Sequence, residues 1–129
     1  MKNITIGQSA QTRRIFKYED VAAYRRLTGD VGLGFGTLDG NTAVPGPLLA
    51  GLFSYLLGTQ LPGRGTNWLK QSLSFPHSAK VGEEVTAVVE ITRLRPENHL
   101  VNLKATCKNS DNKIVCQGNT LVFVKDLEN

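Results

Sequence analysis

The segment from Pro47 to Leu61 constrains the fold more than any other part of the chain, because it is apolar on nearly every side. Pro47 suits the first position of a helix, since the N–H that proline lacks would have no partner there. A helix that is apolar almost all round is expected to be buried rather than to lie on a surface. Small residues recur along it and predict a stripe that another backbone can approach closely: Gly51, Ser54 and Gly58.

The sequence after this helix favours β-structure throughout. Val, Ile, Leu, Thr and Phe are frequent in four segments, which predict strands at Trp68–Phe75, Glu84–Leu94, Leu100–Lys108 and Ile114–Val124. The third segment alternates, with Val101, Leu103, Ala105 and Cys107 on one face. A two-residue turn at Asp111-Asn112 would pair Cys107 with Cys116 and Leu103 with Thr120.

The N-terminal part adds a strand over 11–16 and a helix over 18–28, which Gly29 is well placed to end. A buried helix followed by antiparallel strands predicts an α+β fold, in which a sheet wraps around a long central helix. A chain of 129 residues fits one domain, spanning 1–129.

Composition excludes several functional classes. The net charge of +4 comes from scattered basic residues without the dense stripe that a nucleic-acid partner requires. The N-terminus has no apolar run and the apolar helix is too short to span a bilayer, so we expect a cytoplasmic protein with no membrane partner. Cys107 and Cys116 are expected to be reduced core thiols, and His77 and His99 to be surface residues. No metal site follows from their spacing.

Two positions are candidates for chemistry. Asp30 follows the first predicted helix, although aspartate is common at helix ends and in glycine-rich turns. Gly46 stands at the start of the apolar helix, where free N–H groups can bind an anion or a polarised carbonyl oxygen, although this is also an ordinary helix start. A glycine at this position lets a ligand come close to the main chain. The run Gly32-Leu33-Gly34-Phe35-Gly36 lacks the context of a dinucleotide loop.

The chain resembles the MaoC-like family, and most closely its short single-domain (R)-specific enoyl-CoA hydratases. The segments that carry the resemblance keep their order and spacing over nearly the whole chain: Ile6-Gly7-Gln8, Leu27-Thr28-Gly29-Asp30, Leu48 to Ser54, Leu61-Pro62-Gly63-Arg64-Gly65, Leu69 to Phe75 and Val81-Gly82-Glu83-Glu84-Val85.

The resemblance implies a hot-dog fold, a homodimer in which two sheets join, and a substrate carried by coenzyme A or an acyl carrier protein, with no cofactor. In the family, Asp and His of an Asp-x-Asn-Pro-x-His motif hold a water that adds to a trans-2-enoyl thioester. A backbone N–H in a His-Gly pair meets the charge on the thioester oxygen. By position, Asp30 matches the catalytic aspartate, Gly46 the oxyanion donor, and Ser54 a serine that lines the pocket.

The chain departs from the family motif at the catalytic histidine, where Phe35 stands instead. Gly32-Leu33 replaces Asn-Pro, and Pro45 replaces the histidine of the His-Gly pair. No histidine precedes His77, so no other alignment supplies one. The loop between Asp30 and Gly46 is also shorter than usual in the family.

Three hypotheses follow for the activity. Asp30 alone, or with Asp39, performs the acid–base work of a hydratase or dehydratase. Alternatively, one carboxylate performs a simpler reaction, such as double-bond isomerisation or thioester hydrolysis. In the third, the pocket only binds an acyl thioester or has a structural role. Phe35, Pro45, Gly46 and Ser54 are the expected substrate-binding residues, and Phe35 predicts a more apolar pocket for a bulkier substrate than a short enoyl chain.

Overall fold

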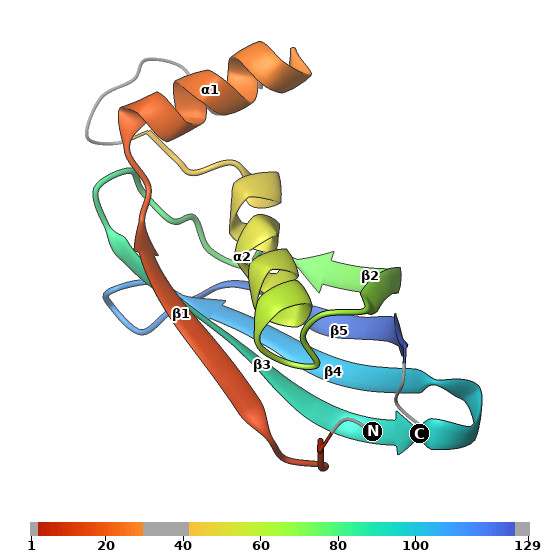
Figure 1. Cartoon of the computed structure of the whole chain (residues 1–129). Helices are drawn as coiled ribbons and strands as arrows, with labels where there is room; N and C mark the ends of the chain where they lie inside the picture. The colour runs from red at the N-terminus through yellow and green to blue at the C-terminus, as the bar shows by residue number, and fades with distance from the viewer. Residues whose placement is uncertain (1–2, 30–41, 126–129) are drawn as a thin grey trace.

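The computed structural model describes residues 3–29 and 42–125, which form a five-stranded antiparallel sheet and two α-helices (Figure 1). The sheet has the order β1-β3-β4-β5-β2. Its elements are β1 (Ser9–Ile15), α1 (Tyr18–Thr28), α2 (Gly46–Thr59), β2 (Thr66–Ser74), β3 (Glu84–Arg95), a short 3-10 helix (Pro96–Asn98), β4 (Leu100–Lys108) and β5 (Ile114–Val124).

The sheet curves around α2, and their contact forms the core (Figure 1). Strand alternation explains this, because inward positions of the central strands are apolar and outward positions are mostly polar. The buried members in β3 and β4 are Val85, Ala87, Val89, Ile91, Val101, Leu103, Ala105 and Cys107. The expected α+β architecture, a sheet wrapped around a central helix, is confirmed.

The β4–β5 hairpin has the predicted register, with Cys107 opposite Cys116 and Leu103 opposite Thr120. Its turn differs from the prediction by one residue. The Asn112 N–H donates to the Asn109 carbonyl over 3.0 Å, so Ser110 and Asp111 are the central residues. Asn112 then takes a left-handed conformation with φ of 63°, which asparagine tolerates better than most residues.

Helix α1 has the predicted boundaries. Gly29 ends it with φ of 73°, and its N–H donates to the Arg25 carbonyl over 2.8 Å. This left-handed C-cap favours glycine, which has no Cβ. In Figure 1, α1 crosses beyond the N-terminal end of α2 instead of lying on the sheet. Only Val21 of α1 is buried.

Helix α2 begins at Gly46, one residue before the predicted start, and is buried on one side only. The buried side consists of Leu49, Leu52, Phe53, Leu56 and Leu57. Gly51, Ser54 and Tyr55 are exposed, so the prediction of burial all round is wrong for the single chain. The reason is that the sheet covers one side of the helix. A Cβ on Gly51 or Gly58 would meet no heavy atom within 4 Å, so the predicted stripe brings no backbone of this chain close.

No helix in the described ranges is long and apolar enough to cross a membrane.

Candidate active site

The N-terminus of α2 is held in place by the segment that enters it. The Val44 N–H donates to the Ala79 carbonyl over 2.8 Å, and the Val81 N–H donates to the Thr42 carbonyl over 2.9 Å. Pro45 follows as a buried N-cap residue, and its carbonyl accepts the Leu48 N–H over 3.0 Å. These bonds fix the position of the first turn before any ligand binds.

Gly46 is the first residue of α2, so its N–H has no partner within the helix. This N–H donates to no other group in the part of the chain that the structure describes. The positive end of the helix dipole lies at the same place. The Gly46 N–H is therefore a fixed, free donor that can form a hydrogen bond with a carbonyl oxygen as that oxygen gains negative charge.

The space beside the Cα of Gly46 is occupied by the ring of Phe75. A Cβ built on Gly46 would lie 2.9 Å from Cε1 of Phe75 and 3.0 Å from its Cζ. A side chain of the protein therefore lies against Gly46 on the side where a Cβ would point, and the approach of a ligand to the main chain at Gly46 stays a prediction. Phe75 was not among the expected site residues, although it lies two residues after Leu73 and an extended segment points both side chains to the same side.

Ser54 lies about two turns further along α2, on the side of the helix that faces β2. It lines a small cavity of about 160 Å³ together with Leu57, Gly58, Thr66, Asn67, Trp68 and Val122. Among the described residues, the buried hydroxyl of Thr66 has no hydrogen-bond partner. Ser54 thus belongs to a cavity between α2 and the edge strand β2.

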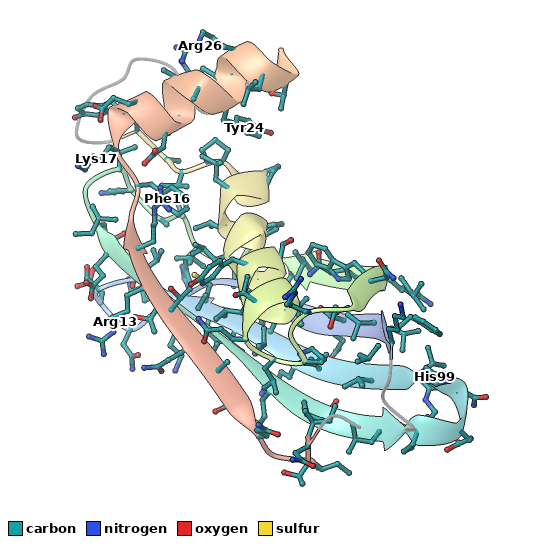
Figure 2. All side chains as sticks on the ribbon, viewed as in Figure 1. Arg13, Phe16, Lys17, Tyr24, Arg26 and His99 are labelled. Carbon is teal, nitrogen blue, oxygen red and sulfur yellow. The ribbon has the colours of Figure 1, made fainter. Side chains whose placement is uncertain are left out.

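A larger groove of about 660 Å³ runs between α1, β1 and α2. Its apolar lining is Phe16, Ala23, Leu27, Leu48, Gly51 and Leu52, and its polar lining is Thr12, Arg13, Arg14, Asp20, Tyr24, Thr28 and Tyr55. Figure 2 shows Phe16 next to β1 and Tyr24 on the side of α1 toward α2. The groove joins the end of α1, which leads into position 30, to the first turn of α2.

Asp30 and Phe35, with Asp39, lie outside the described residues. The residues next to the expected site positions are described. Thr28, two positions before Asp30 in the sequence, and Leu48, two positions after Gly46, both line the groove. The two chain segments that were expected to supply the acid–base group and the oxyanion donor therefore border the same groove.

The only ion pair within the described ranges, Arg14 with Asp20, lies at this groove. Its N–O distance is 3.7 Å, and both side chains are accessible to water. The Arg14 guanidinium also lies 5.5 Å from the centre of the Phe16 ring. An exposed pair of this kind contributes at most about 1 kcal/mol.

The cysteines and histidines do not extend this site. Burial, and to a lesser degree the neighbouring Cys116, raises the pKa of the Cys107 thiol to about 12, and burial raises the pKa of Cys116 to about 11. Both thiols are free and stay protonated near neutral pH, which makes them poor nucleophiles. His77 is exposed, and His99, at the end of the sheet away from α1, is partly buried with its ring 5.5 Å from Phe123 (Figure 2).

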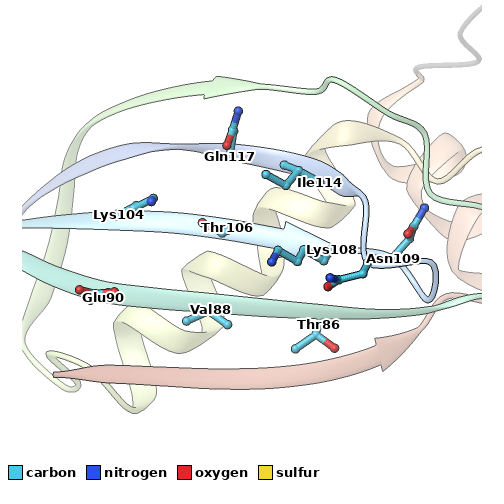
Figure 3. Close-up of a pocket in the computed structure, with 10 residues that line it drawn as sticks. Thr86, Val88, Glu90, Lys104, Thr106, Lys108, Asn109, Ile114 and Gln117 are labelled. Carbon is cyan, nitrogen blue, oxygen red and sulfur yellow. The ribbon is translucent and has the colours of Figure 1, made fainter. Parts of the chain in front are cut away.

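A further hollow of about 460 Å³ lies on the face of the sheet that points away from α2 (Figure 3). It is lined by Thr86, Val88, Glu90, Lys104, Thr106, Lys108, Asn109, Asn112, Ile114 and Gln117. None of the expected site residues belongs to it. The described residues also contain no group of three or more His, Cys, Asp or Glu side chains that could hold a metal ion.

Comparison with known proteins assigns the family. No family model matches the chain. An (R)-specific enoyl-CoA hydratase from Aeromonas caviae is 40% identical over 79% of this chain and 81% of its own length. The chain belongs to the MaoC-like hydratase family. A second relative of this hydratase family, named a 3-hydroxybutyryl-CoA dehydratase, from Methylorubrum extorquens, is 30% identical over 98% of this chain and 85% of its own length.

The solved structure of an (R)-hydratase from A. caviae superposes on this MaoC-like chain with a TM-score of 0.89. It is 35% identical and covers 96% of this chain and 99% of its own. The resemblance to MaoC-like hydratases and the hot-dog fold are thus confirmed. The relatives are named hydratases and dehydratases, so the family is one of lyases.

Proposed function

We propose that the protein catalyses the reversible addition of water to a trans-2-enoyl thioester of coenzyme A, with Asp30 as its one acid–base residue. The observation that carries the proposal is the free N–H of Gly46, which is held at the fixed start of α2, two residues before Leu48 of the groove that Thr28 also lines. Coenzyme A is favoured over a carrier protein because the relatives with 30% identity or more are named for coenzyme A substrates.

One carboxylate can complete the hydration in two steps. Asp30 first accepts a proton from water while the water oxygen bonds to carbon 3, and the electron pair of the double bond moves toward the thioester. The thioester oxygen then carries negative charge, which the Gly46 N–H stabilises by a hydrogen bond. Asp30, now a carboxylic acid, returns its proton to carbon 2 and restores the thioester carbonyl. Dehydration is the reverse of these steps.

Phe35 and Pro45 replace the two histidines of the family motif, so this reaction runs without a second acid–base group. The loss of one such group lowers the rate by about two to four decades. A second candidate function is therefore movement of the double bond, in which Asp30 takes a proton from carbon 4 and delivers it to carbon 2. The replacement at position 35 favours this reaction, because it activates no water and needs only one carboxylate.

The remaining expected residues shape the binding site in this proposal. Pro45 sets the direction of the first turn of α2, and Phe35 contributes an apolar wall. Ser54 lines the cavity toward β2, where an acyl group could extend. The separate groove of about 660 Å³ between α1, β1 and α2 lies in the size range of ligand sites, which supports a substrate bulkier than a short enoyl chain.

We further propose that two copies form a homodimer by joining their sheets along β2. β2 is an edge strand of the sheet, and an unpaired edge is a ready site for another strand. Two large apolar side chains on β2 are exposed, Trp68 by 39% and Leu69 by 55%. Exposed apolar side chains on an edge strand are typical of a surface that binds a partner.

The test is a spectrophotometric assay of a panel of trans-2-enoyl-CoA thioesters with the purified protein, its Asp30→Asn variant and its Phe35→His variant. We expect slow loss of the enoyl absorbance with the native protein, none with Asp30→Asn, and faster turnover with Phe35→His. Chromatography of the products separates the 3-hydroxyacyl product of hydration from the 3-enoyl product of isomerisation. Turnover that survives Asp30→Asn would contradict the role of Asp30. No native turnover, with activity appearing in Phe35→His, would indicate a hydratase scaffold that now binds or isomerises.

A further inference from the structure

Phe75 lies directly after β2 and continues the inward face of that strand. Side chains two residues apart in an extended segment point to the same side. Leu73 is partly buried and packs against the core under α2, so Phe75 points toward the N-terminal end of the same helix. The contact with Gly46 confirms this direction, because Cε1 and Cζ of the ring lie 2.9 and 3.0 Å from the position of a Cβ on Gly46.

The ring of Phe75 is not enclosed by this contact. It is 48% exposed, although complete burial of a phenylalanine side chain would stabilise the folded protein more. One edge of the ring meets the main chain of Gly46, and much of the remainder faces open space. The protein thus holds a large apolar surface against a backbone unit whose N–H is also free.

Gly46 thus presents two kinds of contact side by side: its own free N–H and the exposed ring of Phe75 that lies against it. A carbonyl oxygen suits the donor, and an apolar group attached to that carbonyl suits the ring. In a thioester, carbon 2 is bonded directly to the carbonyl carbon. An oxygen that accepts the Gly46 N–H therefore brings carbon 2 close to the backbone of Gly46, where the ring lies.

We propose that Phe75 is a specificity-determining residue that limits the size of the substituent on carbon 2 of the acyl group. This inference rests on the proposed function, since it takes Gly46 as the site of the thioester oxygen. A hydrogen on carbon 2 fits beside the Phe75 ring, whereas a methyl group on carbon 2 would clash with the ring. The substrate class is therefore thioesters without a branch at carbon 2.

The experiment compares trans-2-butenoyl-CoA with trans-2-methyl-2-butenoyl-CoA and measures kcat/KM for each. The variants are Phe75→Leu and Phe75→Ala, which shorten the side chain in steps. We expect the ratio of kcat/KM for the branched to the unbranched substrate to rise by about tenfold or more in Phe75→Ala, and by less in Phe75→Leu. A ratio that stays constant across the series would overturn the inference, because general damage to the fold lowers both values together.

Ile6→Ala is the matched control. Ile6 is 66% exposed and precedes β1, so its truncation also removes an exposed apolar side chain. The ratio should be unchanged in this variant. A rise of the same size in Ile6→Ala would show that the ratio does not report on Phe75, and would overturn the inference as well.

A binding measurement separates this inference from the proposed function. Calorimetry with butanoyl-CoA and 2-methylbutanoyl-CoA gives the affinity for each saturated thioester without any turnover. A preference for the unbranched ligand that weakens in Phe75→Ala supports the inference even where no hydration is detected. Turnover that depends on Asp30 with a constant ratio would leave the proposed function intact and overturn the role of Phe75. Absence of binding of both thioesters would overturn both.

Discussion

The β4–β5 hairpin and helix α1 differ in how much of their apolar surface is buried. In β4, Leu103 is 1% exposed and Val101 and Ala105 are fully buried. In α1, only Val21 is buried, and Leu27 is 86% exposed. The hairpin is therefore part of the core, whereas α1 is attached beside it.

This difference separates stability from the proposed chemistry. The side chains that bury most apolar surface come from the sheet and from one side of α2. The end of α1, which leads into Asp30, and the exposed ring of Phe75 contribute little to that core. Elements with few buried contacts are the ones that can change position at low free energy. We expect substitutions in the core to lower mainly the free energy of unfolding, and substitutions at the end of α1 or at Phe75 to change mainly the activity.

The largest expected effect on the free energy of unfolding comes from comparing a leucine-to-alanine substitution in the hairpin with one in α1. Leu103→Ala leaves a cavity in the core and should lower the free energy of unfolding by about 2–5 kcal/mol. Leu27→Ala removes an exposed side chain and should change it by less than about 0.5 kcal/mol. Urea denaturation at one fixed protein concentration measures both. Equal losses would show that α1 is as much a part of the core as the hairpin.

The same hairpin shows how far the sequence predicts this fold. Strict alternation in β4 predicted the inward face, and the expected turn at Asp111-Asn112 predicted the pairing of Cys107 with Cys116, which is confirmed although the turn lies one residue earlier. The C-terminal end of α1 was predicted because Gly29 permits a left-handed C-cap that most residues avoid. These features depend on neighbours in the sequence, so a local pattern suffices to predict them.

Features that depend on distant segments were predicted less well. The exposure of Ser54 and Tyr55 depends on which side of α2 the sheet covers, and the helix alone does not contain that information. The start of β2 at Thr66 and Asn67 was missed, because these polar residues are strand-forming only through their pairing with β5. Gly46 was identified as a helix-start donor, but its contact with Phe75 joins segments that are far apart in the chain.

The second prediction concerns the two thiols of the hairpin at alkaline pH. Their folded-state pKa values, about 12 for Cys107 and about 11 for Cys116, lie above the ordinary value of 9.0. Above pH 9.0 the unfolded chain ionises its thiols while the folded chain keeps them protonated, so stability is full below pH 9.0 and falls as the pH rises. The loss is at most about 1.4 kcal/mol per pH unit for each thiol.

The measurement is denaturation between pH 8 and about 11, with Cys107→Ala/Cys116→Ala as the control. The double variant should be less stable at pH 8 but should lose less stability as the pH rises, because its unfolded state has no thiols to ionise. Parallel losses in the two proteins would show that burial does not shift these groups. Helix α1 contains no cysteine, so it does not contribute to this loss of stability at alkaline pH.

A third prediction tests the contact between Phe75 and Gly46 as packing. Gly46→Ala would place a methyl group against the ring and should cost about 1 kcal/mol, at the low end for overpacking because a half-exposed ring can move. In the Phe75→Ala background the same substitution should cost nothing or stabilise the helix slightly, since alanine is the better helix former. A double-mutant cycle by urea denaturation measures the coupling. Additive effects would show that the two residues do not touch in solution.

The smallest expected effect concerns Asp20, which caps the start of α1. Its Oδ2 accepts the Lys17 N–H over 2.8 Å, and its Oδ1 lies 3.7 Å from Arg14. Asp20→Asn keeps a side-chain oxygen for the hydrogen bond but removes the charge, so it should cost about 0.5 kcal/mol, and less at high salt. Asp20→Ala removes both interactions and should cost about 1 kcal/mol.

The comparison of the two variants decides which interaction positions α1. If Asp20→Asn costs as much as Asp20→Ala at every salt concentration, charge rather than capping holds the helix beside β1. If only Asp20→Ala affects stability, the hydrogen bond at Lys17 is sufficient and Arg14 is available to other groups in the groove. Under the proposed function we expect enoyl-CoA turnover to be more sensitive than the free energy of unfolding to both variants, because α1 ends one residue before Gly29-Asp30 in the sequence and contributes little to the core.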